Sequence, residues 1–150
     1  WRLSYFADNN PIPTEEVLIR LIALLLIFIF VHLIKNNRGS AHIVLFFLMT
    51  TQVVNAFFHI FFSFYFNDFS PGVITSVLVY LPGNFLIVRA AFQGGYLKSF
   101  AEYGFIALLG TATFVLFEIY GPLVIVLSIF SSLLYFVWFN KRLAAEDQHT

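Results

Sequence analysis

Five long apolar segments limit what this chain can fold into. They run over residues 17–34, 41–66, 72–92, 104–120 and 123–139 and are joined by short connections. A hydrocarbon layer of ~30 Å needs about 20 mostly apolar residues in a helix, and each segment comes close to that length. A membrane barrel would instead need segments that alternate apolar and polar residues. The sequence therefore predicts an all-α polytopic transmembrane bundle of five spans, with residues 1–150 forming a single domain.

The composition excludes a soluble enzyme. Charged residues make up 11% of the chain and hydrophobic ones 60%, and the mean hydropathy is +0.87, whereas soluble domains carry about 25% charged residues. Eight basic residues balance eight acidic ones, which leaves no positive excess for nucleic acid. The absence of cysteine excludes disulfides and cysteine-ligated metals. We expect membrane lipids, and other membrane subunits, as partners in a multi-pass integral membrane protein.

The charges between the spans predict the orientation. Three basic groups share one side, namely Lys35 with Arg38, Arg89 with Lys98, and Lys141 with Arg142, while most acidic residues fall on the other side. By the positive-inside rule, the N-terminus lies outside and the C-terminus in the cytoplasm. A chain that starts outside needs a removed signal peptide or an earlier helix to translocate it.

Polar residues form a stripe along the second span. Gln52, Asn55, His59 and Ser63 are spaced by three, four and four residues, which places them on one side of a helix. Polar side chains are costly in hydrocarbon, so we expect this stripe to face protein and not lipid.

Two interpretations of the stripe stay open. In the structural one, Asn55 and His59 hydrogen-bond to neighbouring helices and fix their packing. In the functional one, His59 is a base or a metal ligand, with Asn55 and Thr75 as orienting groups. Glu15 and Glu118 are the further metal-ligand candidates, because both are expected at the same outer depth. Thr75 also suits a cap in the first turn of the third span.

Pro82, Gly83 and Asn84 interrupt the third span in its middle. A proline inside a helix removes one hydrogen bond, so the sequence predicts a kink and a freed carbonyl that Asn84 or a partner helix must satisfy. A substrate pocket beside the kink is a further interpretation, since broken helices can line binding cavities.

Small residues and histidines give two weaker signals. Gly104, Ala107 and Thr111 offer a small-residue face for helix packing on the fourth span. His32 and His42 lie at facing ends of consecutive spans, which suggests a haem pair, but interfacial positions disfavour haem ligation. The sequence leaves the cofactor unknown.

One stretch resembles a known family. Asn55-Ala-Phe-Phe-His59, then Phe69-Ser-Pro71-Gly72-Val-Ile-Thr75 and Leu81-Pro82, resemble the C-terminal half of the HXXEE membrane domain, over roughly residues 41–92. The resemblance implies a small helical membrane domain of uncharacterised activity.

The His-x-x-Glu-Glu element that names this family is not in the sequence. If Glu15 and Glu16 were its acidic pair, Ile12 would stand where the histidine belongs. We therefore expect the motif upstream of Trp1, on an added helix that would give six spans with both ends cytoplasmic. The alternative is a divergent member with a depleted site.

Three functions follow from these observations. The first is a non-catalytic membrane protein, or a subunit of a larger membrane assembly, whose polar stripe sets helix packing. The second is a membrane enzyme acting on a lipid or other apolar substrate, with or without a metal, with His59 at its centre. The third is a small carrier or channel, which rests on the interruption at Pro82 alone.

Overall fold

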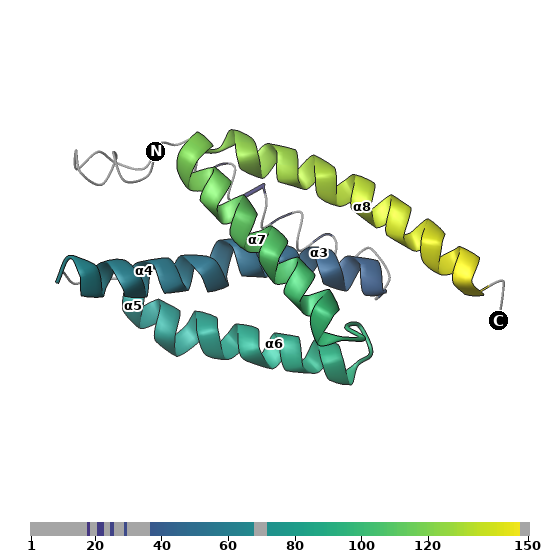
Figure 1. The fold of residues 1–150 in the computed structure, drawn as a ribbon, viewed down its shortest axis with the longest axis horizontal. Helices are drawn as coiled ribbons and strands as arrows, with labels where there is room; N and C mark the ends of the chain where they lie inside the picture. Colours follow the sequence, from purple (N-terminus) through teal and green to yellow (C-terminus); the bar gives the residue numbers. More distant parts are fainter. Residues whose placement is uncertain are drawn as a thin grey trace. The chain divides into compact units, whose positions relative to one another are not determined.

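The described part of the chain is helical. The computed structural model describes residues 37–67 and 72–147, together with Leu18, Leu21, Ile22, Leu25 and Ile29, five helical positions of the first predicted span. The elements are α3 (Arg38–Leu48), η1 (Met49–Val53), α4 (Val54–Tyr65), α5 (Gly72–Thr75), η2 (Ser76–Tyr80), α6 (Leu81–Gln93), α7 (Phe100–Tyr120) and α8 (Leu123–Asp147) (Figure 1). No strand occurs among these residues, which confirms the all-α prediction.

Four helices are long and apolar enough to cross a membrane. They are Arg38–Tyr65, Gly72–Gln93, Phe100–Tyr120 and Leu123–Ala145. These correspond to the second to fifth predicted spans. The prediction of five spans is therefore corrected to four within the described residues, because the segment 17–34 lies almost entirely outside them.

Two helices begin earlier than hydropathy predicts, because polar side chains cap their first turns. The Asn37 Oδ1 accepts the Ser40 backbone N–H at 2.9 Å, and the helix starts at Arg38. The Ser99 Oγ accepts the Glu102 N–H at 3.1 Å, while the Glu102 carboxylate accepts the Lys98 N–H at 2.6 Å. Such reciprocal caps satisfy backbone donors that the helix leaves unpaired.

The chain forms two compact units, Trp1–Ile43 with Val115–Thr150, and Val44–Phe114. The single domain expected from the sequence stays a prediction. In the second unit, α4 lies beside α5 and η2 (Figure 1). The buried apolar cluster of this unit consists of Leu45, Ala91, Leu97 and Ile106.

In the first unit, a tight turn joins α7 to α8. Gly121 has φ +75°, a conformation that glycine adopts without strain, and its N–H donates to the Phe117 carbonyl at 2.8 Å. Beyond this turn, α8 continues past the predicted end at residue 139 to Asp147. A helix does not have to end where its apolar stretch ends.

The helices Arg38–Tyr65 and Gly72–Gln93, called the helix pair below, each contain a π-helical segment. In η1, the hydroxyls of Thr50 and Thr51 bond to the carbonyls of Phe46 and Phe47 at 2.9 and 2.7 Å. Threonine hydroxyls that bond four residues back compete with the regular helical pattern. This competition gives a local reason for the wider turn at this point.

The second π-helical segment directly precedes Pro82. The Leu81 N–H bonds to the Ser76 carbonyl, five residues back, as a π-helix requires. The wider turn accommodates the proline ring, which would collide with a carbonyl in a regular helix. The helix is continuous from Gly72 to Gln93, and the kink expected at Pro82 stays a prediction.

Candidate functional site

A buried amide connects the two π-helical segments. Asn84, on α6, is 5% exposed. Its Nδ2 donates to the Gln52 Oε1 on η1 at 2.8 Å and to the Tyr80 carbonyl at 2.8 Å. Asn84 thus bonds to a carbonyl of its own helix and also to a partner helix. A proline frees the carbonyl four residues before it, which is not that of Tyr80, so the expected partner of the freed carbonyl stays a prediction.

His59 lies against the first residue of α5. A Cβ added at Gly72 would lie 2.9 Å from the His59 Nδ1 and 3.0 Å from its Cε1 and Cγ. Real Cβ atoms essentially never come this close to other atoms, so only glycine fits here without movement. The imidazole is half-buried and faces protein, as the stripe predicted.

Ser76 is the most enclosed polar residue of the site. Its exposed fraction is 0%, and its Oγ has no hydrogen-bond partner among the described residues. Along the helix pair it falls between the two contacts that fix the pairing, Gly72 with His59 and Asn84 with Gln52. Leaving a buried hydroxyl without a partner costs about 1–3 kcal/mol. Such a group marks either a packing compromise or a binding position.

The predicted site residues are distributed unevenly. Asn55 and Ser63 are half-buried on the stripe, whereas Thr75 is exposed at the end of α5. Sequence reasoning singled out Thr75 and missed its buried neighbour Ser76. Both hydroxyls lie in the first turns of the helix, and the sequence alone does not say which of them the partner helix covers.

The metal interpretation stays a prediction. No group of three or more His, Asp or Glu side chains that could hold a metal occurs among the described residues. Of the proposed ligands, Glu15 lies outside those residues, and Glu118 belongs to the first unit whereas His59 belongs to the second. The role of His59 as a base or ligand is likewise untested.

A second polar contact lies in the first unit. The His42 Nδ1 is 2.7 Å from the Tyr135 hydroxyl oxygen, and His42 is 3% exposed. The Phe139 ring lies 4.8 Å from the imidazole, centroid to centroid. His32, the other histidine of the haem interpretation, lies outside the described residues. His42 thus joins the start of α3 to α8, a contact that sequence analysis did not anticipate.

The apolar helices and the buried amide contact together define a class, the multi-pass helical proteins of membrane type. The chain belongs to the family described as proteins of unknown function with an HXXEE motif, whose model matches residues 5–87. This match confirms the resemblance and extends it towards the N-terminus, to residue 5. No curated protein and no solved structure matches the chain.

Proposed function

We propose that the protein is a non-catalytic multi-pass membrane protein whose polar contact fixes the packing of two membrane-spanning helices. The observation that carries this proposal is the bond between Asn84 and Gln52, at 2.8 Å, in the middle of apolar helices. Hydrocarbon offers no other hydrogen-bonding partner, so the two amides favour one register of the helix pair. Non-catalytic function as a subunit of a larger assembly belongs to the same proposal.

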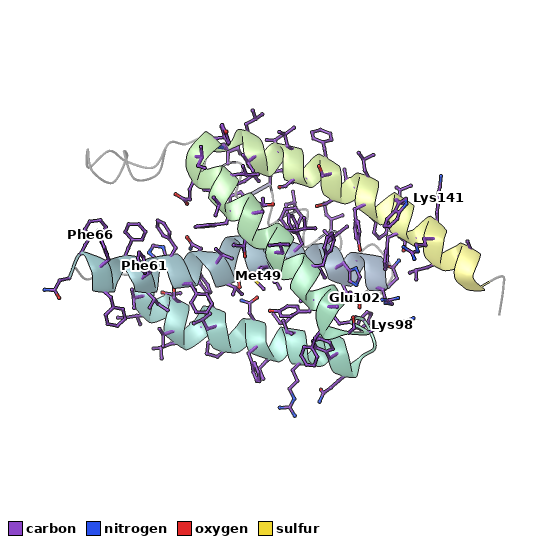
Figure 2. All side chains as sticks on the ribbon, in the orientation of Figure 1. Met49, Phe61, Phe66, Lys98, Glu102 and Lys141 are labelled. Atoms are coloured by element: carbon purple, nitrogen blue, oxygen red, sulfur yellow. The ribbon has the colours of Figure 1, made fainter. Side chains whose placement is uncertain are left out.

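The exposed side chains support association with lipid or with neighbouring subunits. Phe61 on α4 is 60% exposed and Leu134 on α8 is 74% exposed. Figure 2 shows Phe61 on α4 and Phe66 directly after its last residue. The basic residues support an orientation with the N-terminus outside and the C-terminus in the cytoplasm.

A double-mutant cycle tests the proposal. We expect Asn84→Ala and Gln52→Ala each to lower the free energy of unfolding, with a coupling energy of about 0.6 kcal/mol, the average for hydrogen bonds between membrane helices, and no more than about 1.7 kcal/mol. Unfolding in mixed detergent micelles measures it. Gln93→Ala, at the exposed end of α6, is the matched control and should change little. Additive effects of the two substitutions would count against a shared contact.

A membrane enzyme is the second candidate. It is favoured by the half-buried imidazole of His59 in a helix pair that also encloses the unpaired Ser76 hydroxyl. In this interpretation His59 is a base or metal ligand that acts on a lipid or other apolar substrate, and Asn55 and Thr75 orient it. The carrier or channel interpretation rests on the kink expected at Pro82, which stays a prediction.

The two candidates make opposite predictions for His59→Ala. The packing proposal expects lower thermal stability in detergent, with no separate loss of chemistry. A variant of unchanged stability that no longer turned over an apolar substrate would favour the enzyme. Elemental analysis of the purified protein tests its metal-dependent form, which requires stoichiometric zinc, iron, manganese or copper.

A further inference from the structure

Three cations gather where the start of α3 meets the end of α8. The Arg38 guanidinium carbon lies 5.5 Å from the Phe139 ring centroid, and that of Arg142 lies 5.9 Å from the Trp138 ring centroid. Lys141 lies beside Arg142 in the sequence, and both are exposed. Nitrogen atoms gather around Lys141 on α8 (Figure 2). We call Arg38, Lys141 and Arg142 the basic patch.

Close helix contacts hold the two sides of the basic patch together. A Cβ added at Gly39 would lie 3.1 Å from the Asn140 Oδ1 and 3.4 Å from the Phe136 ring. One turn further along α3, His42 contacts the Tyr135 hydroxyl at 2.7 Å. The backbone positions of Arg38, Lys141 and Arg142 are therefore fixed by the packing of α3 against α8.

The three side chains of the basic patch are cationic. The first turn of α3 adds the positive end of a helix dipole, which attracts anions. Of the side chains that the structure describes in this unit, Glu118 alone carries a carboxylate. It lies near the end of α7, before the turn that leads into α8. Glu146 and Asp147 follow Arg142 in the last turn of α8.

Exposed apolar side chains adjoin the basic patch on α8. Leu134 is 74% exposed, Val137 52% and Trp138 56%. A tryptophan next to basic residues at the end of an apolar helix is typical of the level of the lipid headgroups. The same surface therefore offers cations to a phosphate and an apolar strip to acyl chains.

We propose that the basic patch binds the headgroup of an anionic phospholipid. A guanidinium presents paired donors that match phosphate oxygens, and a lysine ammonium adds a point charge. Contacts with the ring faces of Phe139 and Trp138 restrict the orientations of the Arg38 and Arg142 guanidiniums. The acyl chains of the same lipid lie along Leu134 and Val137. This inference does not rest on the proposed packing function.

The test compares the full chain in nanodiscs of phosphatidylcholine alone and with added phosphatidylglycerol. Phosphatidylglycerol should raise the thermal transition of the natural protein and remain bound in native mass spectrometry. We expect each neutralised charge to weaken this binding about fivefold, from ~1 kcal/mol per basic residue near a membrane surface. The variant is Arg38→Gln with Lys141→Gln and Arg142→Gln.

The matched control neutralises two cations outside the basic patch, Arg89→Gln with Lys98→Gln. Because Arg89 and Lys98 are expected on the same side of the membrane, this control should lose some of the phosphatidylglycerol effect, but less than the patch variant loses. The proposal is overturned if the patch variant keeps the full effect, if the control loses as much, or if free glycerol phosphate stabilises the protein equally well. Should the triple variant not fold, Lys141→Gln alone changes one exposed residue and must still weaken binding about fivefold.

Discussion

Gly110→Leu is expected to disrupt the packing of α7 on η1 more than any other single substitution in the second unit. A Cβ added at Gly110 would lie 2.8 Å from the Met49 Cγ, 2.9 Å from its Cβ and 3.2 Å from the Thr50 Oγ1. Met49 is 7% exposed, so it has little room to move. Figure 2 shows Met49 in this crowded region. Overpacking costs about 1–3 kcal/mol, and leucine adds further atoms beyond Cβ.

Gly104→Leu is the matched control on the same helix, because a Cβ added there meets no atom within 4 Å. The free energy of unfolding in detergent should fall strongly for Gly110→Leu and stay near the natural value for Gly104→Leu. Met49→Ala should restore part of the loss. Equal effects at the two glycines would show that α7 does not pack through Gly110.

Gly72→Leu is expected to have the second largest effect. The new side chain would begin 2.9 Å from the His59 Nδ1, so either the imidazole or the start of α5 must move. We expect a loss of about 1–3 kcal/mol in the free energy of unfolding. Gly83→Leu is the control, because a Cβ at this position of α6 meets nothing within 4 Å.

A second substitution distinguishes a steric cause from a general helix effect. His59→Ala removes the ring that Gly72→Leu would strike, so the double variant should be more stable than Gly72→Leu alone. Thermal melts of the single and double variants in one detergent measure this rescue. If His59→Ala gives no rescue, the imidazole does not pack on α5 in the folded protein.

The sequence predicts the helices well because membrane helices are recognisable by their length and apolarity. It also predicts that Gln52 and His59 face protein, since polar side chains in hydrocarbon need partners. The ends of the helices are predicted less well. Ser99 and Glu102 form the cap that starts α7, but this short polar signal lies outside the apolar segment that hydropathy detects.

The details of the site depend on contacts between distant residues. Asn84 meets Gln52 across 32 positions of sequence, and His42 meets Tyr135 across 93. Ser76 is enclosed at the start of η2, whereas the sequence analysis singled out its exposed neighbour Thr75. Likewise, hydropathy and residue size do not show which glycine of α7 packs against another helix. In the structure Gly110 packs against Met49, whereas a Cβ at Gly104 would meet no atom within 4 Å.

The family assignment supports the interpretation of the chain as a helical membrane domain, but it names no activity. Its model covers residues 5–87, which include Gln52, His59, Ser76 and Pro82 of the helix pair. The family description gives no activity. The physical contacts of the helix pair therefore carry the functional argument.

Solid-state nuclear magnetic resonance in lipid bilayers tests the central contact most directly. Nitrogen-15 in the Asn84 side chain and carbon-13 in the Gln52 carboxamide would report their separation, with Asn84→Asp identifying the signal. A strong through-space coupling between the two groups is the predicted result, because the nitrogen and the Gln52 oxygen are 2.8 Å apart. No coupling in folded, bilayer-embedded protein would contradict a polar contact that joins the two helices.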